Sequence, residues 1–192
     1  ASNGFVAVVL KYRMPKGVHT VPLEDAEKAI SVLRENADKW NLDKSKVGVV
    51  GSSAGGHLAA CAATMAKHRP AAAILAYPVI LEGLAAICAK GAPGADKAVD
   101  SQTCPCFIAA AGTDTTVSAM NSLRFVEALY ENGISVMMAT PTAARPRWMA
   151  EKYPEVLRVN AARERNLYGE RHNHCYTSPV YREKTRIINT KL

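Results

Sequence analysis

Apolar runs and amphipathic segments alternate along the first 139 residues. Continuous apolar runs, which are typical of strands buried on both faces, occur at 5–10, 46–50, 71–77, 107–111 and 134–138. Between them, apolar residues recur three or four positions apart, which predicts helices over 22–37, 55–67 and 122–131. This alternation indicates an α/β fold with a mostly parallel sheet and helices on both of its faces.

The same pattern predicts burial at particular positions. The strand at 5–10 reads FVAVVL, so both of its faces should be covered. Residues 81–103 contain several glycines and prolines and are expected to be irregular. In the last helix, three apolar residues share one face and should point into the core: Leu123, Val126 and Leu129.

Positive charge is concentrated in the last quarter of the chain. The 192 residues carry 24 Lys and Arg against 17 Asp and Glu, a net charge of +7. Residues 1–139 hold 13 basic and 12 acidic side chains, whereas residues 140–192 hold 11 and 5. A basic surplus can serve nucleic-acid binding, but no DNA or RNA motif is legible in this segment. A solvated basic terminus is the preferred interpretation, and no nucleic-acid partner is expected.

Composition narrows the class of protein further. Hydrophobic residues are 48% and charged residues 21%, as in ordinary globular proteins. No segment approaches the roughly 18 apolar residues of a membrane helix, and the start of the chain makes a poor signal peptide. The five cysteines are irregularly spaced, and Cys104-Pro105-Cys106 lacks a second pair at zinc-finger distance. We therefore expect reduced thiols, a cytoplasmic location, no membrane partner and no metal.

One motif carries a chemical hypothesis. Residues 51–55 read G-S-S-A-G, a G-x-S-x-G pattern with Ser53 at its centre, between a predicted strand and a predicted helix. A serine on so sharp a turn leaves no room for side chains two residues away, which Gly51 and Gly55 provide. The turn would expose the Ser53 hydroxyl as a nucleophile and aim the Ala54 N–H at a developing oxyanion. The alternative is a structural serine in a glycine-rich turn.

A nucleophilic serine needs a base that is oriented by an acid. Asp114 follows the strand predicted at 107–111, and in a parallel sheet this places it at the same edge as Ser53. The order, serine before aspartate, is that of a G-x-S-x-G hydrolase. The alternative is that Asp114 caps the turn that follows it.

Together these residues resemble a known family, the α/β-hydrolase serine esterases of the acetyl-esterase, lipase-like (acetyl xylan esterase-like) type. The matching stretches are 4–13, 22–30, 47–60, 77–79, 112–117 and 121–129. The resemblance implies serine carboxylesterase chemistry without a cofactor, with Ser53 as nucleophile and Asp114 as the acid. It also implies structural roles for the pair Tyr12-Arg13 and for His57. An α/β-hydrolase core is expected over 1–138, followed by a basic segment of unclear packing over 139–192.

Two features depart from that family. Its HGG-type oxyanion loop would precede the first strand, and no such loop stands in this sequence. Its histidine would follow the strand at 134–138, where residues 139–148 contain none. His172 and His174 are candidates for the base, without local support. Because the resemblance stops near Ala139, one hypothesis is that the reading frame changes there; another is that the chain is a fragment.

The sequence therefore leads to one main hypothesis and two alternatives. The main hypothesis is a serine esterase of small acyl esters, such as acetylated carbohydrates, with a small-molecule partner and an oligomeric state left open. The second is an incomplete or non-catalytic hydrolase-fold module, suggested by the missing loop and histidine. The third is nucleic-acid binding by the basic tail, which would show as steeply salt-dependent affinity.

Overall fold

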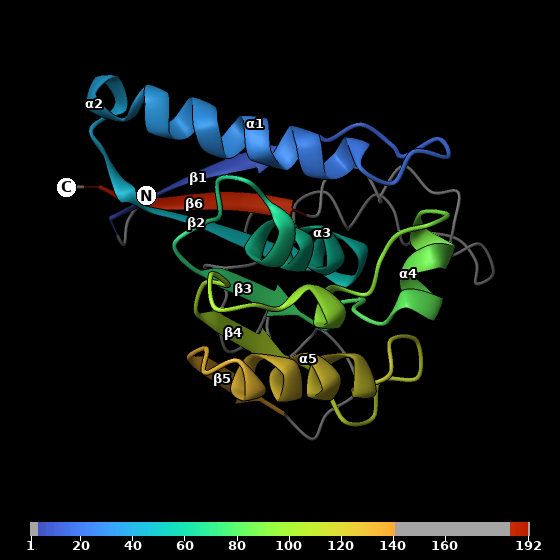
Figure 1. Ribbon diagram of the computed structural model, residues 1–192. Helices are drawn as coiled ribbons and strands as arrows, with labels where there is room; N and C mark the ends of the chain where they lie inside the picture. Colours follow the sequence, from blue (N-terminus) through green and yellow to red (C-terminus); the bar gives the residue numbers. More distant parts are fainter. Residues whose placement is uncertain (1–3, 141–184, 192) are drawn as a thin grey trace, which may run out of the picture.

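The computed structural model describes residues 4–140 and 185–191 of the 192-residue chain. They form a six-stranded sheet in the order β1-β6-β2-β3-β4-β5 (Figure 1). The strands are β1 (Phe5–Leu10), β2 (Leu42–Ser52), β3 (Ala73–Ala76), β4 (Cys106–Ala109), β5 (Val136–Ala139) and β6 (Thr185–Lys191). The helices are α1 (Val21–Glu35), α2 (Ala37–Trp40), α3 (Ser53–Met65), α4 (Glu82–Cys88) and α5 (Met120–Glu131), with a 3₁₀ turn at Ala95–Ala98.

Parallel pairing joins four consecutive strands. β2 pairs with β3, β3 with β4 and β4 with β5, each in parallel. Only β6 runs antiparallel to its neighbours β1 and β2 among the described strands. The predicted class, α/β with a mostly parallel sheet, is confirmed. Because the carboxyl ends of β2 and β4 share one edge, the residues that follow them lie on the same side of the molecule.

The main core lies between the sheet and the helices α1, α3 and α5 (Figure 1). One row of paired positions crosses the sheet through Val49, Ala73 and Cys106, and each of these side chains is at most 5% exposed. Ile30 of α1 and Phe125 of α5 belong to the same core cluster as this row, and both are fully buried. Apolar burial of this kind stabilises the fold by about 25 cal/mol per Å² of apolar surface removed from water.

The next row of the sheet is far more exposed. It runs from Val50 through Ile74 and Phe107 to Met137, whose side chain is 66% exposed. On β1, Phe5 and Val9 are 42% and 44% exposed. The expectation that the strand at 5–10 is covered on both faces is therefore wrong. Helices were expected on both faces of the sheet, whereas α1, α3 and α5, the three longest helices in the described residues, lie together on one face (Figure 1).

Three further details differ from the sequence-based expectations. Residues 81–103 contain the helix α4 and a 3₁₀ turn instead of being wholly irregular. Thr185–Lys191, within the segment interpreted as a solvated terminus, forms β6 inside the sheet. Leu123 is 45% exposed, because the buried face of α5 is centred on Phe125 and Leu129. No helix in the described part of the chain is long and apolar enough to span a membrane.

Candidate active site

Ser53 lies at a strained turn between β2 and α3. Its φ is +53°, a left-handed conformation that is uncommon for residues other than glycine. A Cβ added to Gly51 would lie 2.1 Å from the Gly55 carbonyl oxygen, so the turn closes only with glycine at position 51. A Cβ added to Gly56 would lie 2.8 Å from the Pro78 Cβ. Strained backbone of this kind persists where the surrounding structure holds it, and it clusters at functional sites.

The N-terminus of α3 supplies positive potential beside Ser53. The first four N–H groups of a helix have no acceptor within the helix, and Ala54 lies in that first turn. The helix dipole favours negative charge at this end. The Ala54 N–H can therefore donate to an oxyanion formed next to Ser53. Ala54 itself is 8% exposed, so its methyl group packs inward.

The segment after β3 packs directly against this turn. The Val79 N–H donates to the Ser53 carbonyl oxygen at 3.1 Å. Tyr77 is itself strained, with a φ of +36°, and its N–H donates to the Ala109 carbonyl at 2.6 Å. The N–H groups of Ile80 and Leu81 both donate to Oδ1 of Asn121, each at 2.9 Å. Two turns at the carboxyl edge of the sheet are thus held against each other.

His57 has a structural role. It is 9% exposed, its Nδ1 lies 3.1 Å from the Val79 carbonyl oxygen, and its Nε2 lies 3.4 Å from the Cys61 Sγ. Burial lowers the pKa of its imidazole, which favours the neutral ring. With both nitrogens engaged away from Ser53, His57 is not positioned to take the Ser53 proton. This agrees with the role that the family resemblance implies.

Asp114 lies in the loop after β4, as predicted, and it caps the turn there. Its Oδ1 accepts hydrogen bonds from the N–H groups of Thr116 at 2.8 Å and Val117 at 2.9 Å. The side chain is half-buried. Both alternatives from the sequence remain compatible with this geometry, because capping occupies one carboxylate oxygen and an acid needs one oxygen to orient a histidine.

The described residues do not include a histidine that is placed to act as the base for Ser53. Within residues 4–140 and 185–191, no hydrogen bond joins the Ser53 hydroxyl to a histidine. His19 lies in the loop before α1, with its Nδ1 near Gly91, and His68 is exposed beyond the end of α3. His172 and His174 lie outside the described residues. The structure therefore brings together the predicted nucleophile turn and oxyanion donor, and it does not show the base.

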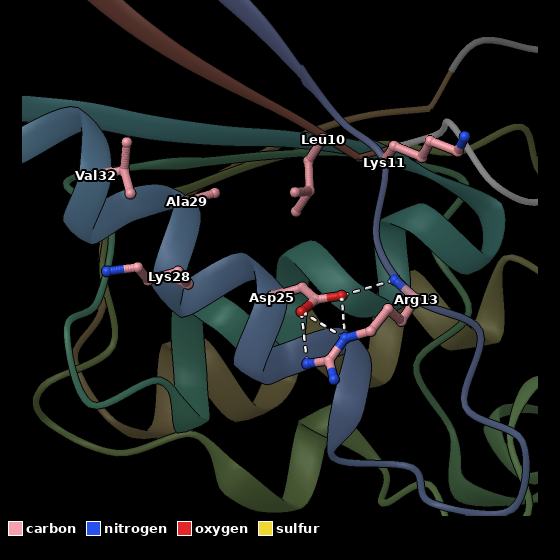
Figure 2. Close-up of a pocket in the computed structure, with 7 residues that line it drawn as sticks. All are labelled: Leu10, Lys11, Arg13, Asp25, Lys28, Ala29 and Val32. Atoms are coloured by element: carbon pink, nitrogen blue, oxygen red, sulfur yellow. Dashed lines mark hydrogen bonds and ion pairs between the residues drawn. The ribbon is translucent and has the colours of Figure 1, made fainter.

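The pair Tyr12-Arg13 fixes the start of the chain to α1. The Arg13 guanidinium donates to both oxygens of Asp25, at 2.7 Å from Nη2 to Oδ1 and 3.1 Å from Nε to Oδ2 (Figure 2). This pairing holds the pKa of Asp25 below its ordinary value. Tyr12 is 7% exposed, and burial raises its pKa to about 12.

Figure 2 shows the shallow pocket of about 410 Å³ beside this pair, between β1 and α1. None of its lining residues belongs to the Ser53 turn. The pocket is therefore separate from the candidate active site, and the structural role implied for Tyr12-Arg13 fits these contacts.

The described cysteines do not form a metal site. No disulfide joins the four described cysteines, which are Cys61, Cys88, Cys104 and Cys106. The Cys106 Sγ donates to the Cys104 carbonyl oxygen at 3.3 Å. Burial raises the pKa of the Cys61 thiol to about 12. In the described ranges no group of three or more His, Cys, Asp or Glu side chains could hold a metal ion.

Sequence reasoning missed Asn121, whose side chain holds Ile80 and Leu81, next to the Val79 that bonds to Ser53. Asn121 is 3% exposed, at the start of α5. The signal in the sequence was weak, because an Asn before an amphipathic helix usually indicates a helix cap. Its actual partners lie about 40 residues upstream, a separation that no local pattern reveals.

The comparison with solved structures defines the class of fold. An acetyl ester-xyloside bifunctional hydrolase from Caldicellulosiruptor lactoaceticus superposes with a TM-score of 0.65 at 27% sequence identity. The match covers 76% of this chain and 65% of that one. The described core has an α/β-hydrolase fold.

The two ends of the chain match two different families. The BD-FAE family model matches residues 1–81, and a β-galactosidase family model, Glyco_hydro_42, matches residues 122–192. An acetylxylan esterase from Xylanibacter ruminicola is 42% identical over 80 residues, covering 41% of this chain and 17% of that protein. The β-galactosidase BglY from Alicyclobacillus acidocaldarius is 60% identical over 67 residues, covering 35% of this chain and 10% of that protein. The chain thus spans only a small part of each curated relative.

These matches correct one hypothesis about the C-terminal segment. Residues read in an altered frame would not retain 60% identity to another protein over 67 residues. The altered-frame hypothesis is therefore wrong. The end of the esterase resemblance coincides instead with sequence that is similar to β-galactosidases. The match begins at residue 122, so β5 and all but the first two residues of α5 fall within it, and it overlaps the stretch 121–129 that also resembles the esterases. The division at residue 138 stays a prediction.

Proposed function

We propose that this chain is a serine carboxylesterase that hydrolyses small acyl esters through an acyl-enzyme. The observation that carries the proposal is Ser53, held at φ +53° on the turn between β2 and α3, with Gly51 packed against Gly55. A strained serine on a strand–turn–helix motif is the structural context in which G-x-S-x-G acts as a nucleophile. Similarity of the fold to esterases supports the same chemistry.

The proposed reaction begins with attack by Ser53 Oγ on the acyl carbon. A base takes the hydroxyl proton as the new C–O bond forms, and the Ala54 N–H stabilises the oxyanion. The tetrahedral intermediate collapses, and the alcohol leaves with the proton that the base returns. Water then attacks the acyl-enzyme by the same steps, which releases the acid and restores Ser53. Asp114 orients the base; the candidates for the base are His172 and His174.

Acetylated carbohydrate is the substrate class that the relatives favour. An acetylxylan esterase matches this chain over 80 residues, and the solved neighbour is named for acetyl ester and xyloside hydrolysis. The chemistry needs no metal or organic cofactor. The cytoplasmic location remains a prediction from the irregular spacing of the cysteines.

Hydrolysis of a short-chain nitrophenyl ester by the full chain tests this proposal. Ser53→Ala should lower the rate by at least a thousandfold, because the acyl-enzyme can no longer form. Ser52→Ala is the matched control, since Ser52 precedes α3 without a side-chain cap hydrogen bond. Hydrolysis that is equal in both variants would refute the assignment of Ser53.

A non-catalytic hydrolase-fold module is the second candidate. The observation that favours it is that the described histidine nearest in sequence to Ser53, His57, is engaged by Val79 and Cys61. This candidate predicts a folded chain with no ester hydrolysis above that of the Ser53→Ala variant. The two candidates therefore separate in the same experiment.

A further inference from the structure

The segment 77–81 connects the Ser53 turn to the start of α5. On one side, Val79 binds the turn twice: its N–H donates to the Ser53 carbonyl at 3.1 Å, and its carbonyl oxygen lies 3.1 Å from His57 Nδ1. Pro78 packs against Gly56 so closely that a Cβ on that glycine would lie 2.8 Å from the Pro78 Cβ. A shift of this segment would therefore move the backbone of Ser53.

On the other side, Asn121 holds the same segment. Its Oδ1 accepts from the N–H groups of both Ile80 and Leu81 at 2.9 Å, and its Nδ2 donates to the Ser118 carbonyl at 3.1 Å. The side chain is 3% exposed. Ile80 is fully buried, so water cannot easily replace the acceptor that its N–H would lose.

The restraint by Asn121 matters because the backbone is strained at both ends of this connection. Tyr77, at the beginning of the segment, has a φ of +36°, and Ser53 has a φ of +53°. Such conformations persist only where the surroundings hold them in place. When the acceptor behind Ile80 and Leu81 is removed, both turns are free to relax toward ordinary backbone angles. The Ser53 hydroxyl and the Ala54 N–H would then change their relative orientation.

We infer that Asn121 is a positioning residue for the nucleophile turn, acting on Ser53 through Val79. The inference rests on the proposed function, since it assigns to Asn121 the orientation of a reactive Ser53. It joins the start of α5, at the boundary of the β-galactosidase-like sequence, to the turn in the esterase-like sequence. Misplacement of a reacting group by about 1 Å lowers rates up to about a hundredfold.

The test measures the rate at which a fluorophosphonate labels Ser53 in the full chain. Asn121→Ala removes the acceptor, and labelling should slow by about tenfold to a hundredfold. Asn121→Asp keeps an acceptor oxygen for Ile80 and Leu81 but loses the donor to the Ser118 carbonyl, so its labelling should slow less than that of Asn121→Ala. Asn132→Ala is the matched control: the exposed side chain of Asn132, the residue that caps the end of the same helix, donates to the Ala128 carbonyl, and the labelling rate should not change.

Hydrogen exchange on the wild-type chain gives a second, independent readout. The Ile80 and Leu81 amides should exchange slowly, although both bond only to a side chain. Fast exchange of both amides would overturn the restraint. Equal labelling of Asn121→Ala and Asn132→Ala, or equal slowing in Asn121→Ala and Asn121→Asp, would overturn the positioning role.

If Asn121→Ala does not fold, the labelling rate of the Asp variant and the exchange measurement on the wild type test the proposal. Failure of the wild type to label at all would refute the proposed function instead, and slow exchange would still establish the restraint.

Discussion

The turn around Ser53 and the α5–β5 unit at the sheet edge make different demands on their sequences. The turn needs glycine at position 51, a left-handed Ser53 and a close approach of Pro78. The edge unit needs only a helix with a buried apolar face and an apolar strand that pairs in parallel with β4. The turn lies within the BD-FAE match, and nearly all of the edge unit lies within the β-galactosidase match.

This difference shows why one sheet can include sequence that resembles two families. An amphipathic helix followed by an apolar strand satisfies the edge of any parallel sheet, because it buries the helix face and continues the backbone ladder. Phe125 and Leu129 meet that requirement here, both fully buried. A nucleophile turn instead depends on particular residues at particular distances. The sequence of such a turn therefore indicates the family that it resembles.

The largest expected effect tests whether α5 belongs to the core. Phe125→Ala should lower the free energy of unfolding by about 3–5 kcal/mol, because it removes a fully buried aromatic ring. Leu123→Ala on the same helix is the control, and it should cost far less since Leu123 is 45% exposed. Urea denaturation measures both. Similar losses for the two variants would mean that α5 is not packed as described.

The next effect concerns the turn. Gly51→Ala should destabilise the fold by about 1–3 kcal/mol and abolish labelling at Ser53, because its Cβ would lie 2.1 Å from the Gly55 carbonyl oxygen. Gly83→Ala has open space around its Cβ and is the matched control. Urea denaturation and fluorophosphonate labelling read the two effects separately. A Gly51→Ala variant that labels like the wild type would contradict the geometry of the turn.

Sequence patterns predicted most strands and helices, because each is a continuous or periodic apolar run that is bounded by turn-forming residues. The helix α4 was missed since EGLAAIC is short and lies among glycines, and β6 was missed since its pairing partners, β1 and β2, are far away in sequence. Ser53, Ala54 and the two glycines came from a local motif. Asn121 could not, because its partners depend on how two loops meet in the folded chain.

A pH effect should appear where the connection between α3 and β3 is paired with the segment that precedes β4. The Arg69 guanidinium donates to Asp100, at 2.8 Å from Nη2 to Oδ2, and holds the pKa of that carboxyl well below its ordinary value. The pair therefore stabilises the fold at neutral pH, and this contribution is lost as the pH falls below about 4–5 toward the folded-state pKa.

Asp100→Asn tests this contribution by thermal melts between pH 7 and pH 3. The variant should have a lower Tm at pH 7 and a smaller fall in Tm on acidification than the wild type. Asp38→Asn, which changes a carboxylate that is 88% exposed, is the control and should follow the wild-type curve. A Tm–pH curve for Asp100→Asn that is parallel to the wild-type curve would show that the pair does not contribute.

The smallest effect is expected on the outer face of α5. Arg124 and Glu127 form an ion pair at 2.7 Å, with both side chains more than half exposed. Solvent screens such pairs, so Arg124→Ala should change the Tm by about 1–2 °C or less. A fall in Tm comparable to that of Phe125→Ala would mean that the exposed face of α5 is covered by another part of the protein.

The central claim is that Ser53 is a reactive nucleophile, and stoichiometric labelling tests it most directly. The full chain is treated with a fluorophosphonate, digested and analysed by mass spectrometry. The account predicts one adduct per chain, on the peptide that contains Ser53, present in Ser52→Ala and absent in Ser53→Ala. An unlabelled wild-type chain, or an adduct that persists in Ser53→Ala, would contradict it.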